Sequence, residues 1–133
     1  MKFKGEKSER GAWAEQQAAH YLEQQGLIVN TRNYLCKSGE IDLVMKDGEL
    51  LVFIEVRQRN SQYYGSAIET VDRRKQRKLI RAARHYLQKF GLTERVACRF
   101  DVIGVEPSSE TAVPHTQSAK ITWVRDAFRL DWC

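Results

Sequence analysis

Two acidic residues, Asp42 and Glu55, could together bind a divalent cation, because the sequence places them on two strands that should be neighbours. They lie in apolar segments, residues 39–46 and 49–59, on either side of Asp47-Gly48. An Asp-Gly pair is typical of two-residue turns in β-hairpins, since both central positions there favour a positive φ. We therefore expect an antiparallel hairpin that carries one of these carboxylates on each strand.

The register of this hairpin decides how close the carboxylates come. With a two-residue turn at 47–48, Asp42 faces Phe53. Glu40 then faces Glu55, and Asp42 is a diagonal neighbour of Glu55 on one sheet face, with Cα atoms about 7–8 Å apart. Both side chains can lean onto one cation, with Glu40 as a third acid. Hard oxygen ligands of this kind suit Mg²⁺ or Mn²⁺.

A second interpretation of these acids needs no cation. Glu40 could point to solvent while Glu55 forms an ion pair with Arg57 or Arg59. Structural ion-pair networks gather charges in the same way as functional sites do. The acidic pair alone does not choose between the two interpretations.

A further carboxylate comes from the helix that is expected over residues 9–25 and that ends at Gly26. The inward stripe of this helix recurs at spacings of three and four, and consists of Gly11, Glu15, Ala18, Ala19 and Leu22. Glu15 is the charged residue of the stripe. It is either an edge residue held by an arginine or a carboxylate that is directed at the acidic pair on the sheet.

Three segments of the chain resemble the YraN family of small bacterial proteins. They are residues 39–43 (Gly-Glu-Ile-Asp-Leu), 52–59 (Val-Phe-Ile-Glu-Val-Arg-Gln-Arg) and 99–102 (Arg-Phe-Asp-Val). The resemblance runs from about Gly11 to Phe128. The YraN family is related to archaeal Holliday-junction resolvases and belongs to the restriction-endonuclease-like superfamily.

The superfamily motif is an Asp on one strand and Glu-x-Lys on the next, often with a Glu on the preceding helix. Asp42 and Glu55 match this motif, and Glu15 stands where the helix supplies its acid. The lysine of the motif is Arg57 here. Arginine is permanently charged and can hold a phosphate, but it should not act as a base.

The resemblance implies a restriction-endonuclease-like α/β fold and a Mg- or Mn-dependent endonuclease acting on DNA, including branched or single-stranded structures. Asp42, Glu55 and Glu40 would hold the metal, with Glu15 completing the set. Related resolvases act as homodimers, although nothing in this sequence identifies a dimer face. Arg57 leaves a second reading open, a non-catalytic DNA-binding module with an impaired nuclease site. A third class, an assembly protein with a structural acidic cluster, would neither bind nor cleave DNA.

The longest helix is expected over residues 66–90, opened by a capping box of Ser66 and Glu69 and closed by Gly91. Its outer surface carries charge of one sign, from Arg73, Arg74, Arg77, Lys78, Arg81 and Arg84. A charge run is usually just a solvated surface. Here the mutual repulsion favours a phosphate-facing role, with Arg59 as a further DNA contact.

Lys75 lies on the inner stripe of the same helix, four residues after Val71 and four before Leu79. A lysine among apolar residues is unfavourable unless it meets an acid. Lys75 therefore either extends its charged end to solvent or reaches the acidic pair, where it could take the place of the missing catalytic lysine.

The other expected strands cover residues 27–35, at a sheet edge, 96–105 and 120–124, and Asp126 is expected to cap a closing turn of helix. Arg99 and Asp101 should form a structural ion pair. The order of elements, α-β-β-β-α-β-β, predicts a mixed sheet flanked by helices in a single nuclease-like domain across residues 1–133.

Composition agrees with a nucleic-acid partner. The 133 residues include 22 Lys or Arg and 17 Asp or Glu, which gives a net charge of +5 and favours a polyanion. We expect no membrane association, because no stretch approaches the roughly 20 apolar residues of a membrane span. The charged N-terminus does not read as a signal peptide, so a cytoplasmic protein is expected.

Overall fold

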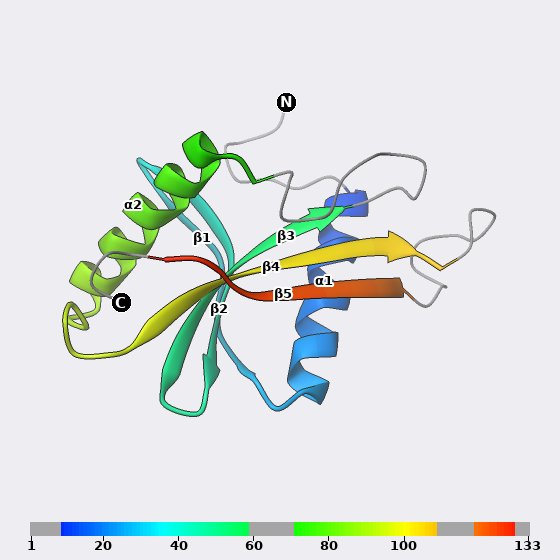
Figure 1. Cartoon of the computed structure of the whole chain (residues 1–133), viewed down its shortest axis with the longest axis horizontal. Helices are drawn as coiled ribbons and strands as arrows, with labels where there is room; N and C mark the ends of the chain where they lie inside the picture. The colour runs from blue at the N-terminus through cyan, green and yellow to red at the C-terminus, as the bar shows by residue number, and fades with distance from the viewer. Residues whose placement is uncertain (1–8, 59–70, 109–118, 130–133) are drawn as a thin grey trace.

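The computed structural model describes residues 9–58, 71–108 and 119–129, and Figure 1 shows how their helices and strands are arranged. In chain order the elements are α1 (Glu9–Gln24), β1 (Ile28–Cys36), β2 (Gly39–Asp47), β3 (Leu50–Gln58), α2 (Arg73–Lys89), β4 (Cys98–Pro107) and β5 (Ala119–Phe128). The predicted α/β class and the order α-β-β-β-α-β-β are confirmed.

The five strands form one mixed sheet in the order β1-β2-β3-β4-β5. Neighbouring strands are antiparallel except for β3 and β4, which are parallel. Parallel neighbours need a long crossover connection, and α2 lies in that connection. As predicted, β1 is an edge strand.

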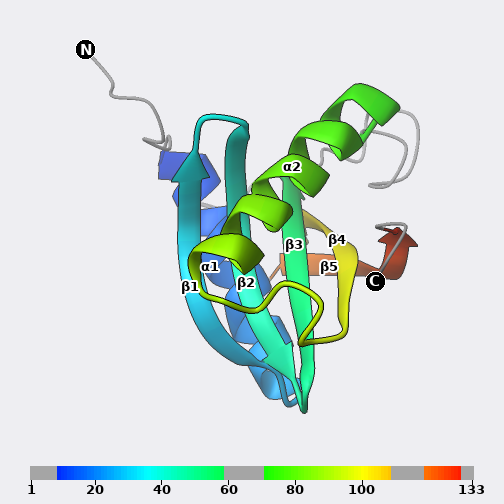
Figure 2. The same ribbon diagram turned by 90° about the vertical axis from the view of Figure 1, so that its left-hand side faces the viewer.

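The two helices cover opposite faces of the sheet. Figure 2 shows α2 in front of β1, β2 and β3, with α1 behind them. The α1-side core includes Leu22, Leu43, Met45, Val52 and Ile54. The α2-side core includes Ile41, Val44, Phe53, Leu79 and Tyr86. The central strands are therefore buried on both faces, and a polar side chain within them needs a reason to be there.

The hairpin register differs from the predicted one by two residues. Asp47 pairs with Leu50, so the turn consists of Gly48 and Glu49 rather than of Asp47 and Gly48. Gly48 has φ 63° and Glu49 has no positive φ, the pattern of a turn with glycine at its first central position. A two-residue shift keeps every side chain on its sheet face, but it changes which residues lie opposite each other.

The second helix begins later than predicted. Val71 and Asp72 are not helical, and α2 starts at Arg73, because the Asp72 carboxylate caps it by accepting a 2.8 Å hydrogen bond from the Lys75 backbone N–H. The predicted capping box of Ser66 and Glu69 lies outside the described residues. The predicted end of the helix is correct, since Gly91 follows it with φ 68°.

The predicted helical turn at Asp126 is wrong, because the last strand continues through it to Phe128. A bulge between β4 and β5 gives Asp126 a φ of 52° and turns its N–H towards Asp101, which accepts it at 2.9 Å. Asp101 also accepts hydrogen bonds from Arg99 Nε and Trp123 Nε1. The predicted Arg99–Asp101 pair is therefore confirmed as part of a buried network. Neither helix in the described part of the chain is long and apolar enough to cross a membrane.

Candidate metal centre

The candidate site lies where β2 and β3 separate. Their pairing runs from Asp47–Leu50 to Leu43–Ile54, and Asp42 and Glu55 are the next residues along the two strands. The Val56 N–H donates a 2.8 Å hydrogen bond to Asp42 Oδ2. The carboxylate thus satisfies a backbone donor that would otherwise pair with a carbonyl of the neighbouring strand. This hydrogen bond fixes the Asp42 side chain at the fork between the strands.

Three carboxylates meet at this fork. Glu15 from α1 and Glu40 and Asp42 from β2 each present an oxygen, and the three oxygens lie within 4.8 Å of one another. We call these residues the acidic cluster. Glu15 is 7% exposed and Asp42 5%, so their mutual repulsion is poorly screened by water. Of the two alternatives left open for Glu15, the structure shows the one in which its side chain reaches the acids of the sheet.

The donor set of the acidic cluster fits a hard divalent cation. All three ligand atoms are carboxylate oxygens, the donors that Mg²⁺ and Mn²⁺ prefer. They come from two elements, so a cation would also join α1 to the sheet. The cluster could therefore bind a metal ion.

Glu55 lies beside the acidic cluster rather than within it. It shares a side-chain hydrogen bond with Asp42, which requires a proton between the two carboxyl groups. Burial and, after it, the charge of Asp42 raise the pKa of Glu55 from 4.5 to about 8, against the opposing charges of Lys75 and Arg57. A pKa of about 8 favours the protonated form of the Glu55 carboxyl near neutral pH.

The predicted contact between Glu40 and Glu55 is wrong. The two-residue change of register removes that pairing, and Glu40 instead pairs across to Leu35 of β1 and lies beside Glu15. Asp42 is the residue that connects Glu40 on one side with Glu55 on the other.

Two positive charges approach Glu55. Arg57 Nε lies 3.3 Å and Lys75 Nζ 3.6 Å from the same atom, Glu55 Oε2. Lys75 comes from the first turn of α2, whose start is set by Asp72. Its side chain is 35% exposed, so it meets an acid while remaining accessible to a ligand. The sequence left this contact open as one of two outcomes.

Asn33 is a component of the site that we did not predict. With its amide nitrogen facing the acids, Nδ2 donates to Glu15 Oε1 at 2.8 Å and to Glu40 Oε1 at 2.9 Å. Asn33 has φ 52° in the middle of β1. The available signal was an asparagine inside an otherwise β-rich segment, because Asn is the residue that most readily joins glycine in this conformation.

Comparison with known proteins places the chain in a family. The model of the uncharacterised protein family UPF0102 matches residues 14–105. The chain belongs to the UPF0102 family. The resemblance to the YraN family, which is the same family, is thereby confirmed. The matched range contains the acidic cluster, Asn33, Glu55, Arg57 and Lys75.

Relatives of this UPF0102 chain match over almost their whole length. A UPF0102 protein of Nitrosococcus oceani is 48% identical over 123 residues, which are 92% of this chain and 94% of the relative. One of Alcanivorax borkumensis is 46% identical, covering 92% and 93% of the two chains. One of Legionella pneumophila (strain Corby) is 40% identical, covering 90% and 94%.

The basic residues of this UPF0102 chain that were predicted to bind DNA share the exposed surface of α2. We call it the basic surface, and it consists of Arg73, Arg74, Arg77, Lys78 and Arg81. It begins close to the site, because Lys78 Cβ lies 4.0 Å from the position that a Cβ on Gly39 would occupy, and Gly39 directly precedes Glu40. Arg59 lies outside the described residues.

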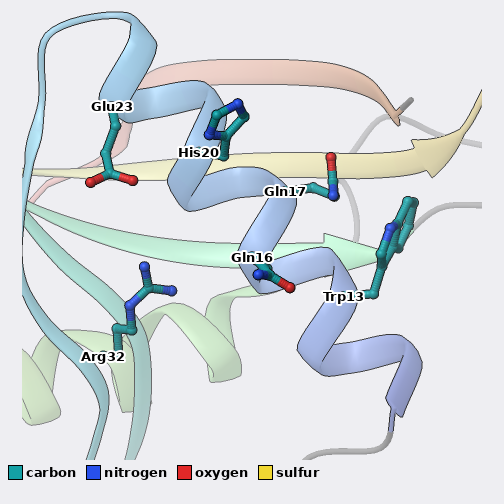
Figure 3. A pocket seen from close by; sticks show the side chains of 6 residues that line it. All are labelled: Trp13, Gln16, Gln17, His20, Glu23 and Arg32. Carbon is teal, nitrogen blue, oxygen red and sulfur yellow. The ribbon is translucent and has the colours of Figure 1, made fainter. Parts of the chain in front are cut away.

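A separate concavity of about 330 Å³ lies between α1 and β1 in this UPF0102 chain. Figure 3 shows its lining side chains, which are Trp13, Gln16, Gln17, His20, Glu23 and Arg32. None of the predicted site residues lines it. Its volume is at the lower end for small-molecule sites, and the acidic cluster is the better supported candidate.

Proposed function

We propose that this protein is a divalent-metal-dependent endonuclease that acts on DNA, with branched or single-stranded structures as its substrates. The observation that carries the proposal is the meeting of Glu15, Glu40 and Asp42 within 4.8 Å, beside Glu55 and two cationic side chains. Carboxylates that repel one another inside a fold are unfavourable unless a cation or a proton separates them. A cation-binding role gives a reason for this arrangement.

The proposed ligands of Mg²⁺ or Mn²⁺ are Asp42, Glu40 and Glu55, with Glu15 completing the set. A bound cation would supply Lewis-acid chemistry, offsetting negative charge on the scissile phosphate and making the attacking water more acidic. Asp42 is positioned for this role by the hydrogen bond from Val56 N–H. Glu55 joins when it releases the proton that it shares with Asp42.

Lys75 and Arg57 would act on the phosphate and on the attacking water. Both lie within 4 Å of Glu55 Oε2, so both can place positive charge where negative charge develops in phosphoryl transfer. The planar guanidinium of Arg57 suits a phosphate contact. Lys75, a compact ammonium, suits the orientation of the water whose oxygen attacks phosphorus as the phosphodiester P–O bond breaks.

Cleavage of labelled DNA tests the proposal directly. Purified protein is incubated with linear, flapped and four-way DNA in the presence of Mg²⁺, Mn²⁺ or a chelator. We expect cleavage with a metal, none with the chelator, and none for Asp42→Asn, because the carboxylate at the centre of the site is then lost. Glu49→Gln, an exposed change in the hairpin turn, is the matched control. Metal-independent cleavage, or none with either metal, would contradict the proposal.

The replacement of the motif lysine by Arg57 favours a second candidate, a DNA-binding module without cleavage. Both candidates predict DNA binding through the basic surface. Only the first predicts metal-dependent strand breaks, so the same incubation separates them.

The basic surface is expected to contribute phosphate contacts. Changing Arg74, Arg77 and Arg81 to Ala should weaken DNA binding and reduce the slope of log K against log salt by about 2–3, since each lost contact to duplex DNA removes about 0.9. Fluorescence anisotropy between 50 and 200 mM salt, roughly the range in which such contacts are most visible, measures this slope.

A second triple variant controls for net charge. Lys46, Arg95 and Lys120 are exposed and lie outside α2, and changing them to Ala removes the same charge. An equal fall in slope for both triple variants would mean that α2 is not a specific contact surface.

A further inference from the structure

We propose that Asn33 is a positioning residue of the metal centre, whose side-chain amide holds Glu15 and Glu40 together in the arrangement that a cation needs. The inference rests on the proposed metal site but not on DNA cleavage. It assigns a role in metal affinity to a residue that is itself not a preferred ligand of the cation.

The contacts of Asn33 support this role. With the amide turned so that its nitrogen rather than its oxygen faces the two acids, Nδ2 lies 2.8 Å from Glu15 Oε1 and 2.9 Å from Glu40 Oε1. An amide nitrogen carries two hydrogens and can donate both at once. Each hydrogen bond is strengthened by the charge of its acceptor. One side chain of β1 therefore ties a carboxylate of α1 to a carboxylate of β2 and offsets part of their repulsion in the metal-free protein.

The same hydrogen bonds do not involve both oxygens of either carboxylate. Each of them uses one oxygen of a carboxylate, and the carboxylate has a second oxygen. A hydrogen-bond donor outside the ligand set fixes the orientation of the ligating carboxylate. Loss of such a donor typically lowers metal affinity about 10–100-fold.

The backbone of Asn33 brings its side chain to the acids. Just before it, Arg32 pairs with Leu43, which lies in the α1-side core. Just after it, Tyr34 pairs with Ile41, which lies in the α2-side core. Along β1, the side chains thus switch from the α1 side of the sheet to the α2 side at Asn33. The same switch occurs in β2 at Asp42, which lies opposite Asn33. The φ of 52° at Asn33 produces this change in β1.

The test separates the amide from the backbone. Asn33→Gly keeps the left-handed conformation available and removes only the side chain. We expect its Mn²⁺ affinity, measured by isothermal titration calorimetry, to fall about tenfold or more. Asn30→Gly is the control, because Asn30 also lies in β1 and loses a comparable contact, its 2.8 Å hydrogen bond to Tyr86. Its Mn²⁺ affinity should match the wild type.

A double-mutant cycle with Glu40→Gln tests the contact itself. If Asn33 acts through the charge of Glu40, the effect of Asn33→Gly on Mn²⁺ affinity should shrink in the Glu40→Gln background. A residue that merely stabilises β1 would lower the melting temperature in chelator and leave the Mn²⁺ affinity and this coupling unchanged, and that result would overturn the inference.

A second variant tests the inference if Asn33→Gly does not fold. Asn33→Asp keeps the size of the side chain and tolerates the same φ, but it faces Glu15 and Glu40 with a third carboxylate. We expect its melting temperature in chelator to be lower than that of the wild type, and the gap to narrow with Mn²⁺. An unchanged melting temperature in chelator would show that the side chain does not face the two acids.

Absence of Mn²⁺ binding by the wild type would instead refute the metal centre and the proposed function with it.

Discussion

Replacing Lys75 with alanine is expected to lower the rate of DNA cleavage by a factor of about 10²–10⁴, the range that a positioned acid–base group supplies, while DNA binding is retained. The reason is the position of Lys75 Nζ, 3.6 Å from Glu55 Oε2. Arg57 occupies the place of the motif lysine, but its planar guanidinium suits a phosphate contact and is not interchangeable with a compact ammonium. Single-turnover cleavage with Mg²⁺ measures the rate, and anisotropy measures the affinity.

Two further variants separate chemistry from packing. Lys75→Met keeps most of the aliphatic stem and removes the charge, so it should be as slow as Lys75→Ala. Lys46→Ala removes an exposed lysine that lies outside α2 and the basic surface, and it should cleave at nearly the wild-type rate. If Lys75→Ala cleaves as fast as the wild type, the ion pair between Lys75 and Glu55 has no part in the reaction.

Arg57→Lys restores the residue of the superfamily motif. If Lys75 supplies the function of the missing lysine, this change should keep or raise activity, and it should partly rescue Lys75→Ala. A wild type that cleaves with neither metal, together with an Arg57→Lys variant that cleaves, would identify a DNA-binding module with a disabled nuclease site.

The elements could be read from the sequence because their signals are local. Helix 9–24 has an apolar stripe and a terminal glycine, and the two central strands are continuous apolar runs. The register of the hairpin could not be read in the same way. The predicted and observed registers differ by two residues and put the same side chains on the same faces, so burial does not distinguish them. In the observed register Gly48 takes the first central position of the turn, with φ 63°.

The start of α2 shows the same limit. The segment before Arg73 contains more than one residue that can cap a helix, and local preference does not rank them. The Asp72 carboxylate accepts the Lys75 N–H, and this choice also places the Lys75 side chain over the sheet.

The acidic residues of the site could be predicted from the sequence, whereas the asparagine that hydrogen-bonds two of them could not. Asp42, Glu55 and Glu15 stand out because charged residues in apolar segments need a reason to be there. Asn33 does not stand out in this way, since a polar asparagine in an edge strand needs no buried partner. Its role depends on a backbone angle within β1 and on two side chains from other elements, and neither is encoded by spacing along the chain.

In chelator, the stability of the wild-type protein is expected to contain a component that falls as pH rises from about 4.5 to about 8. Burial and the neighbouring Asp42 raise the pKa of Glu55 from 4.5 to about 8 in the folded protein. Between these values the folded state holds about one proton more than the unfolded state. This component is fully present below the unfolded pKa and is lost as pH passes through the folded pKa, at about 1.4 kcal/mol per pH unit.

This component is measured from the free energy of urea unfolding between pH 5 and pH 8. The wild type is compared with a variant in which residue 55 does not titrate. Glu55→Gln keeps the shape of the side chain and needs no proton to hydrogen-bond Asp42, so it should gain stability over the wild type as pH rises. Glu49→Gln, at the far end of the hairpin, should follow the wild type throughout. Parallel curves for the wild type and Glu55→Gln would mean that Glu55 is ionised in the folded metal-free protein, and that Lys75 and Arg57 rather than a proton balance the charge at the fork between β2 and β3.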